Sequence, residues 1–418
     1  MAPAPGGGLY LAVPTPAGSV VITLLDSTAQ PRAGWPIVLD GPTACGLVLP
    51  VDDGSVRVLC SPDDLNRELN SGMRAFAFDS TGRLLPGWPV DLDGSYSGRV
   101  IGNELRLFGV GYFSDVVEKG KPSHEGWLVT VAADGAVRSG ARTPLFETCC
   151  VEKWTVGPDG IAYGLLSDGK WPDESTGPSR ITAIDLSGVR SGWPVKINGS
   201  ASLPAFDAAG RIHVIVGSPW ARPARTLVFD PAGRAVDAGS GSLDIEAASE
   251  CVGIGGSCPS PTAPLVGPDG TTFVVGRSGE RTTVAGLNSA GEAMAGWPYR
   301  SKAMIQSNSF CPPRGACDGY TLAAPAIGPG NIVYLLHAAA DSSAGGSIVA
   351  VGRDGGVVHG WPVSLRRPDA GFWSVVVGSD GTVYALAVEP ETKETASATV
   401  LAIAPDGTVL YRMTILEP

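Results

Sequence analysis

Eight cysteines are the residues of this sequence whose type and spacing most directly predict chemistry. Cys149 and Cys150 are adjacent, so they either form a strained vicinal disulfide or pair with cysteines elsewhere in the chain. The even number favours disulfide bonds and an extracytoplasmic compartment, and scattered free thiols in a cytosolic protein are the alternative. The other six enclose short segments, one of them with a hairpin turn at residues 52–54: Cys45 with Cys60, Cys251 with Cys258, and Cys311 with Cys317.

Catalytic and metal-binding patterns are otherwise sparse. The four histidines, His124, His213, His337 and His359, do not have the spacing of metal ligands. The sequence also has no G-x-S-x-G elbow, no phosphate-binding loop and no complete EF-hand loop. A glycoside hydrolase or polysaccharide lyase would assemble its carboxylates from distant loops, so spacing alone does not reveal that chemistry and it stays an alternative.

The composition narrows the class of protein and its partners. The formal net charge of −11 disfavours nucleic acid and anionic membrane surfaces, because the net field repels polyanions. No apolar run approaches the roughly 20 residues of a membrane-spanning helix. Residues 1–8, MAPAPGGG, lack the features of a signal peptide and are predicted to be disordered or trimmed. We therefore expect a secreted, periplasmic or cell-surface protein whose signal peptide is absent from this chain; no pattern indicates an oligomeric state.

A repeated Gly-Trp-Pro motif reveals the elements that must position any site. Its tryptophans recur with a unit of about 52 residues, once the copies that have lost the Trp near residues 139 and 237 are included. Each unit also carries two hairpins with Asp-Gly-type turns flanked by alternating apolar residues. The motif tryptophans are Trp35, Trp88, Trp193, Trp297 and Trp361.

Eight units of four short strands predict an all-β, eight-bladed β-propeller of four-stranded antiparallel blades, forming a single domain over residues 9–418. The first unit shows only three strands, and seven blades with an N-terminal appendage are the alternative. We expect each motif Trp to lie between neighbouring blades, where its large apolar surface is buried. The Pro beside it would protect the outer edge strand from pairing with another chain.

The two faces of this propeller differ in the length of their connections. The turns within the two hairpins of each unit are tight, whereas the connections on the opposite face are long, and binding residues concentrate on such loops. The long connections are residues 61–72, 112–126, 167–179, 218–225, 239–262, 302–320 and 389–397. For the aromatic residues there, packing beneath their own loop is the alternative to binding. The candidate contacts on this face are Glu152, Lys153, Trp154, Asp168, Trp171, Trp220, Arg222, Phe310, Arg314 and Trp373.

Segments such as RITAIDLSGVRSGWPV and GTVYAL followed by VLAIAPDG resemble the repeats of the quinoprotein-like (PQQ-type repeat) β-propeller superfamily. The similarity covers nearly the whole chain, and it is structural in kind. That superfamily contains dehydrogenases as well as cofactor-free scaffolds, so the resemblance does not transfer an activity. In its alcohol dehydrogenases an adjacent cysteine pair lies beside the cofactor, which implies a similar position for Cys149 and Cys150. Their calcium ligands and catalytic Asp match no motif in this sequence.

The sequence thus predicts an exported, non-enzymatic member of this superfamily, without a cofactor, that binds a protein or glycan through its long-loop face. One alternative is a quinoprotein dehydrogenase dependent on PQQ and calcium, with Cys149 and Cys150 at the cofactor. The other alternative is the glycoside hydrolase or polysaccharide lyase described above.

Overall fold

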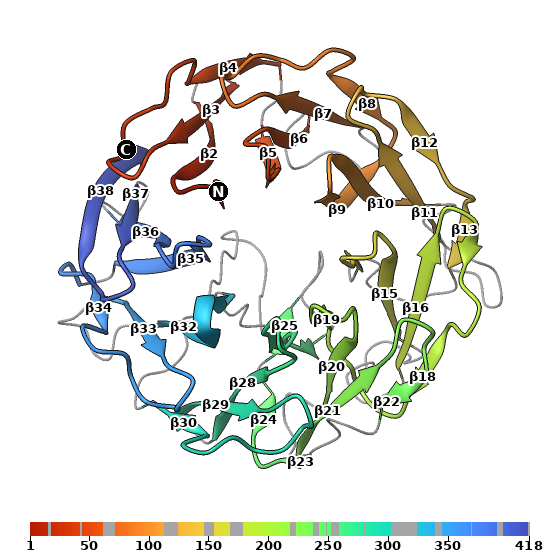
Figure 1. The fold of residues 1–418 in the computed structure, drawn as a ribbon, viewed down its shortest axis with the longest axis vertical. Helices are drawn as coiled ribbons and strands as arrows, with labels where there is room; N and C mark the ends of the chain where they lie inside the picture. The colour runs from red at the N-terminus through yellow and green to blue at the C-terminus, as the bar shows by residue number, and fades with distance from the viewer. Residues whose placement is uncertain are drawn as a thin grey trace.

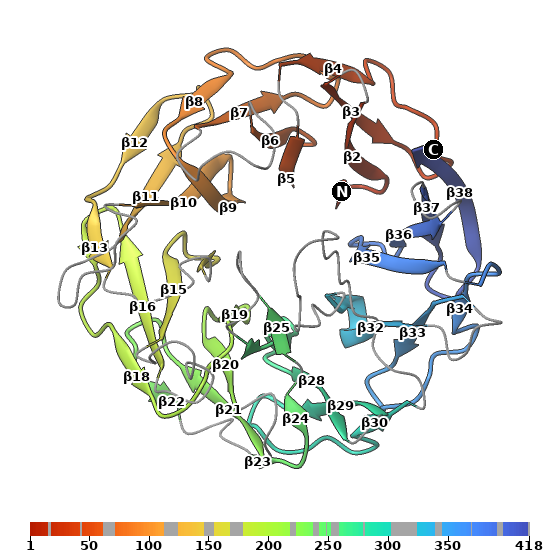
Figure 2. The same cartoon turned by 180° about the vertical axis from the view of Figure 1, so that it is seen from behind.

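The computed structural model describes residues 1–15, 18–41, 44–61, 72–112, 124–145, 154–167, 179–217, 223–236, 242–247, 249–251, 259–278, 281–301, 324–338, 345–368, 370–390 and 396–416. Eight antiparallel sheets stand around a central axis, and both views show the closed ring (Figures 1 and 2). The predicted eight-bladed propeller of four-stranded blades is confirmed, and the alternative with seven blades is wrong. No helix in the described residues is long and apolar enough to cross a membrane.

Within each blade we call the strands A to D from the axis outward, and the blades are numbered along the chain. Blades 1 to 4 contain β1 (Ala2–Pro3), β2 (Leu9–Pro14), β3 (Ser19–Leu25) and β4 (Ile37–Asp40); β5 (Ala44–Pro50), β6 (Val56–Ser61), β7 (Met73–Phe78) and β8 (Val90–Leu92); β9 (Ser95–Ile101), β10 (Glu104–Tyr112), β11 (His124–Val131) and β12 (Val137–Ser139), with β13 (Thr143–Leu145) also pairing β11; and β14 (Trp154–Val156), β15 (Ala162–Ser167), β16 (Ser179–Asp185) and β17 (Gly188–Val189), with β18 (Val195–Ile197) also pairing β16.

Blades 5 to 8 follow the same order, with one 3-10 turn at Pro329–Asn331. They contain β19 (Ala205–Phe206), β20 (Ile212–Val216), β21 (Ala224–Phe229) and β22 (Ala235–Val236), with β23 (Ser242–Leu243) pairing β21; β27 (Leu265–Val266), β28 (Thr272–Ser278), β29 (Arg281–Leu287) and β30 (Tyr299–Arg300), with β24 (Glu246–Ala247) pairing β28 and a separate hairpin of β25 (Ser249–Cys251) and β26 (Pro259–Pro261); β31 (Ala326–Gly328), β32 (Ile332–His337), β33 (Ser347–Val351) and β34 (Val363–Ser364); and β35 (Gly371–Val377), β36 (Val383–Pro390), β37 (Ala396–Ile403) and β38 (Val409–Leu416).

The first blade has four strands where the sequence indicated three. Ala2 and Pro3 pair with Tyr10 and Leu9, and the side chains of Ala2 and Ala4 are buried. The chain turns back through Gly6, Gly7 and Gly8, which all have positive φ, a conformation that costs glycine little. In this structure the first residues of the chain therefore pair within the first blade. A strand of two residues is too short to show alternation, which is why the sequence pattern missed it.

The Gly-Trp-Pro motif joins each blade that carries it to the next one. The Gly before each motif Trp has positive φ, and at Gly34 an added Cβ would lie 1.9 Å from the carbonyl oxygen of Thr81 in blade 2. The five Trp-Pro peptide bonds are cis. Each indole Nε1 donates to a carbonyl oxygen in the C–D turn of the following blade, as predicted for a residue between blades: Trp35 to Ser80, Trp88 to Ala133, Trp193 to Pro231, Trp297 to Arg353 and Trp361 to Pro405.

Each motif Trp also contacts one repeated position on strand B of its own blade. In four blades this position is aromatic, and the ring centroids are 5.0 to 5.6 Å apart, which is the range of favourable aromatic pairs. In blade 2 it is Arg57, whose guanidinium lies 5.5 Å from the centroid of the Trp88 ring although the residue is only 1% exposed. A cation–π contact thus replaces the aromatic pair there. The four aromatic pairs are Tyr10–Trp35, Tyr163–Trp193, Phe273–Trp297 and Tyr334–Trp361.

The ring closes between blades 8 and 1 without a shared strand, since each blade is built from one continuous stretch of chain. Leu9, Leu11 and Leu25 of blade 1 pack against Tyr384 and Val400 of blade 8. The backbone N–H of Gly8 donates to the hydroxyl of Tyr384 at 3.0 Å. Side-chain packing therefore closes the ring at this seam, where β35 and β1 contact each other at the inner edge of the two blades. In Figure 1 the label N marks the end of the chain at which β1 lies.

Candidate functional site

One face of the propeller, which we call the turn face, consists of the A–B and C–D turns. An Asp side chain accepts backbone N–H groups in these turns, as Asp79 does from Thr81 and Arg83. The hydrogen bonds from Arg83 and Thr81 hold the pKa of Asp79 below its usual value, although burial opposes the shift. Such tight, internally satisfied turns leave few polar groups for a ligand, as the sequence predicted for this face.

The opposite face carries the B–C and D–A connections, and we call it the looped face. Most of the predicted contacts on it lie outside the described residues, so their roles stay predictions. Two predicted cysteine pairs also stay predictions, because Cys258, the partner of Cys251, and both Cys311 and Cys317 lie outside the described residues. The same holds for the quinone site expected at the adjacent cysteines. The predicted site residues outside the described ranges are Cys149, Cys150, Glu152, Lys153, Asp168, Trp171, Trp220, Arg222, Phe310 and Arg314.

Trp154 is the first of two predicted contacts that the structure does describe. It begins β14 on the innermost position of blade 4 and is 6% exposed. Its ring stacks on Phe108 of blade 3, with centroids 3.9 Å apart and an interplanar angle of 17°. A Cβ at Gly164 would lie 2.4 Å from the indole, so glycine makes room for it. Trp154 is therefore a packing residue between two blades and not an exposed binding residue in this structure.

Trp373 is the second predicted contact that the structure describes, and its side chain is 39% exposed. It lies near the start of β35, the innermost strand of blade 8, at the end of that strand that meets the looped face. The β35–β36 register shifts between Phe372 and Ser374, so Trp373 is the extra residue of a β-bulge. Bulges redirect side chains. Here Phe372 is buried between blades 7 and 8, while the neighbouring indole reaches solvent.

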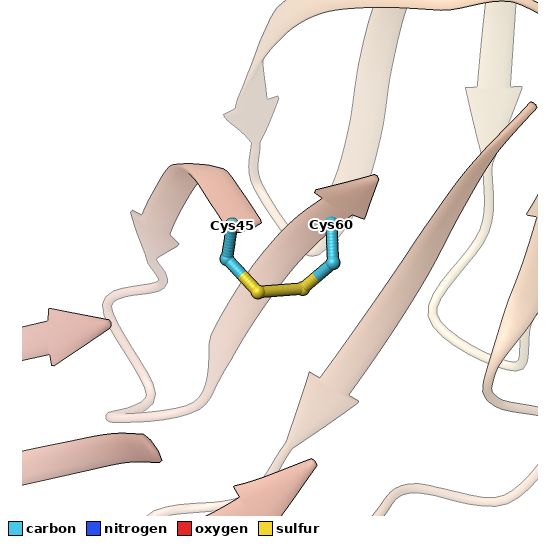
Figure 3. The surroundings of a disulfide bond; sticks show 2 residues. All are labelled: Cys45 and Cys60. Carbon is cyan, nitrogen blue, oxygen red and sulfur yellow. A yellow bond between two sulfur atoms is a disulfide. The ribbon is translucent and has the colours of Figure 1, made fainter. Parts of the chain in front are cut away.

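A disulfide joins Cys45 and Cys60 on the looped-face side of blade 2, as the sequence predicted (Figure 3). The two residues face each other on β5 and β6, and a bulge at the same place as in blade 8 makes Gly46 the extra residue. The bond ties the start of the innermost strand to the end of the second strand, where the connection at 62–71 begins. An intact disulfide is typical of an oxidising, extracytoplasmic compartment.

Replacing both Cys45 and Cys60 with alanine should lower the free energy of unfolding by about 2 kcal/mol, the low end of the usual range because the bond closes a short loop. Urea denaturation followed by far-UV circular dichroism measures this change. A double variant with the same urea midpoint as the parent protein would show that the bond adds no stability.

A network that the sequence did not predict lies on the looped face between blades 2 and 3. The guanidinium of Arg142 stacks on the Trp127 ring at 4.0 Å from its centroid, and it forms ion pairs with Glu125 and, at 3.0 Å, with Asp93. The indole Nε1 of Trp127 donates to the hydroxyl of Tyr96 at 3.2 Å, and that hydroxyl donates to Asp93 at 3.0 Å. Five side chains, four from blade 3 and Asp93 from the connection between β8 and β9, thus form one continuous set of contacts.

Only Gly109 and Gly111 on β10 could have indicated this network from the sequence. A Cβ at Gly109 would lie 2.7 Å from the indole of Trp127, and one at Gly111 would lie 3.2 Å from it. Glycine at alternate positions inside a strand indicates that a large group lies across that side of the sheet. The partner residues, however, are spread from Asp93 to Arg142, so only the folded structure shows that they meet.

Two carboxylates, those of Glu125 and Asp93, converge on Arg142. Converging carboxylates are what a hydrolase or lyase would need. Partial burial opposes the charge on Arg142, but the hydrogen bond and charge of Glu125, with Asp93, raise its pKa overall. Asp93 is 77% exposed whereas Glu125 is mostly buried. Because the guanidinium binds both carboxylates, they are arranged as its ion-pair partners and do not flank an open space as a general acid and base would.

A second polar cluster lies at the turn-face end of blades 5 and 6. Asp207 accepts from the guanidinium Nε of Arg211 at 2.6 Å and lies 3.3 Å from His213 Nε2, and His213 Nδ1 lies 3.1 Å from the hydroxyl of Thr272. The arrangement of a carboxylate, an imidazole and a hydroxyl in contact matches that of a catalytic triad. Asp207, His213 and Thr272 are all buried, and burial lowers the pKa of His213 although Asp207 opposes the shift. The cluster therefore links two blades and does not meet solvent as a nucleophile must.

No group of three or more His, Cys, Asp or Glu side chains within the described residues could hold a metal ion. No protein-family model matches the chain, and no curated protein matches it. The likenesses to known proteins are therefore those of solved structures alone.

Three solved structures illustrate the likeness. Porphyromonas gingivalis dipeptidyl peptidase 4 matches with a TM-score of 0.56 and 9% identity, over 99% of this chain and 60% of that one. A eukaryotic initiation factor matches with a TM-score of 0.53 and 8% identity, over 98% and 96%. A quinoprotein alcohol dehydrogenase-like protein from Bacteroides thetaiotaomicron has a TM-score of 0.41 and 11% identity, over 98% and 92%.

The chain also spans only about half the length of a puromycin-hydrolyzing peptidase from Mycobacterium tuberculosis that it matches. At these identities the similarity concerns the fold, and proteins with this fold have unrelated activities. The chain is a β-propeller.

Proposed function

We propose that this protein is an exported, non-catalytic β-propeller that binds a protein or glycan partner through its looped face. The observation that carries the proposal is Trp373, a large side chain that is 39% exposed on the innermost strand of blade 8. Tryptophan is enriched among the residues that dominate binding energy, because one ring offers a large, rigid contact surface.

The position of Trp373 distinguishes it from the other exposed apolar side chains in the described part of the chain. Those side chains lie on or beside the outer strands, where single apolar residues are common. Trp373 instead stands on β35, which pairs with β36 from Gly371 to Val377 apart from the bulge itself. A side chain on a rigid strand loses little freedom when a partner binds, so more of its contact energy appears as affinity.

Two further observations support a binding role. The carboxylates of Asp93 and Glu125 are engaged by Arg142, and the triad-like cluster at His213 is buried. The side chains of both clusters are of types that can catalyse reactions, but here they hold neighbouring parts of the propeller together. The disulfide at Cys45 and Cys60 supports export.

The proposal predicts that Trp373→Ala lowers partner binding at least tenfold while leaving the melting temperature within about 2 °C of the parent protein, because an exposed side chain contributes little to stability. Immobilised parent and variant proteins would be incubated with the extracytoplasmic fraction of the native source, and the bound molecules compared by mass spectrometry and glycan analysis. Val38→Ala is the matched control, since Val38 is exposed on the outer strand β4. Equal capture by all three proteins would contradict the proposal.

A further inference from the structure

The outer strand of blade 8 differs from the other outer strands of the ring. The strand β38 runs for eight residues, whereas the outer strands that the structure describes in the other blades have two to four. It ends the order β35-β36-β37-β38 and lies on the rim of the ring (Figure 1). Within the described residues only β37 pairs with it, so its outward row of N–H and C=O groups has no partner strand. Such an edge is a template for pairing with another chain.

The features that protect the other outer edges are missing from β38. In five blades a cis Trp-Pro bond comes directly before a short strand at the outer edge. The sequence of β38, VLYRMTIL, contains no Pro, and its one charged residue is Arg412. The register with β37 makes Leu410 and Ile415 extra residues, so the stretch 411–414 between them is regular. Leu410 is 49% exposed. This edge is therefore long enough and regular enough to accept another strand.

The side chains of β38 make the edge complementary to itself. Tyr411, Met413 and Ile415 are half-buried against blade 1, whereas Arg412 and Thr414 are exposed on the other side of the strand. Antiparallel pairing of two copies about Met413 would place Arg412 opposite Thr414 and Tyr411 opposite Ile415. No like charges meet in this register, and an aromatic residue opposite a β-branched one is a favourable cross-strand pair. A pairing centred on Arg412 would instead oppose two guanidinium groups.

We propose that β38 pairs antiparallel with β38 of a second copy of this chain, about a two-fold axis at Met413. A strand edge that is complementary to itself gives the same contacts in both directions, which is the usual form of a homodimer. Because β38 runs from the turn face to the looped face, antiparallel pairing points the two looped faces in opposite directions. Both looped faces then stay accessible, and the inference does not depend on the function proposed for them.

The test is sedimentation velocity of the full chain from low to high micromolar concentration. One strand pair is a small interface, so we expect a weak monomer–dimer equilibrium that depends on concentration. Thr414→Glu should tighten the dimer roughly fivefold, because a carboxylate then faces Arg412 of the second copy at two symmetric places. Thr414→Lys should weaken it roughly fivefold, because like charges then meet at the same two places.

Both expected changes are opposite to the effect of net charge. The chain carries a formal charge of −11, so an added Glu increases the general repulsion between two copies and an added Lys decreases it. The double variant with Arg412→Glu and Thr414→Lys should dimerise at least as tightly as the parent protein, since it exchanges the two partners. Val137→Lys is the matched control, because Val137 is 44% exposed on the outer strand of blade 3, and it should not weaken the dimer.

The substituted side chains of β38 are exposed, so all the variants should keep the circular dichroism spectrum of the parent protein. A parent protein that sediments as a monomer at every concentration would overturn the inference. A dimer that responds alike to Thr414→Glu and Thr414→Lys would also overturn it, since β38 would then not be paired in this register.

Discussion

Replacing Trp361 with alanine should lower the free energy of unfolding by about 4 kcal/mol, as is usual for a buried Trp. Trp361 is 7% exposed, packs 5.4 Å from the ring of Tyr334 in its own blade, and donates from Nε1 to the carbonyl oxygen of Pro405 in blade 8 at 3.0 Å. Alanine would leave a cavity between blades 7 and 8 and remove the donor for that carbonyl. Urea denaturation, followed by fluorescence and by circular dichroism, measures the loss.

Trp373→Ala is the matched control, because it removes the same side chain from the neighbouring blade at an exposed position. We expect a change of less than about 1 kcal/mol, as for most surface substitutions. Equal losses in the two variants would show that the motif indole does not join the blades, and the structural role of the Gly-Trp-Pro repeat would then fail.

Acid should destabilise this protein through His337, which lies at the looped-face end of β32 in blade 7. The side chain is 2% exposed, and within the described residues its Nε2 has no hydrogen-bond partner. Burial lowers the pKa of His337 to about 4 from an ordinary value near 6.5. Between these two values the unfolded chain binds a proton that the folded chain does not. The contribution is therefore fully present above pH 6.5 and is lost as the pH falls, by about 3 kcal/mol at pH 4.

The measurement is the free energy of unfolding from urea titrations between pH 7 and pH 4.5. His337→Asn should reduce the slope across this range whatever its stability at pH 7, because asparagine does not titrate, while the buried His213 still contributes to the slope. His359→Asn is the matched control, since His359 is exposed in a C–D turn, and it should keep the slope of the parent protein. A parent slope that His337→Asn leaves unchanged would show that His337 does not produce the acid sensitivity.

The fold was predictable because each blade is specified by contacts between residues that are close in sequence. The hairpins carry their own turn signals, and the Gly-Trp-Pro motif joins a blade to the next at one repeated place, so a period of about 52 residues is enough to indicate a ring. The alternation of apolar and polar residues did not predict a strand that is only two residues long. Ala2–Pro3 is a strand through its pairing with Tyr10 and Leu9, which the two residues themselves do not indicate.

The candidate site was less predictable, since its residues come together from different blades. Trp154 and Trp373 both precede or begin an inner strand and look alike in the sequence, yet Phe108 and Gly164 bury the first while a bulge turns the second outward. The contacts of Arg142 with Glu125, Asp93 and Trp127 join blade 3 to the connection that precedes it, and none of these spacings repeats along the chain.

The sequence by itself determined the number of blades, the place of the indoles between them and the disulfide of blade 2, because these depend on a repeated local pattern and a single hairpin. Only the tertiary structure decided which tryptophans are exposed and which charged side chains are paired. Burial and pairing are set by atoms that approach from neighbouring blades, and the order of residues along one strand carries no record of them.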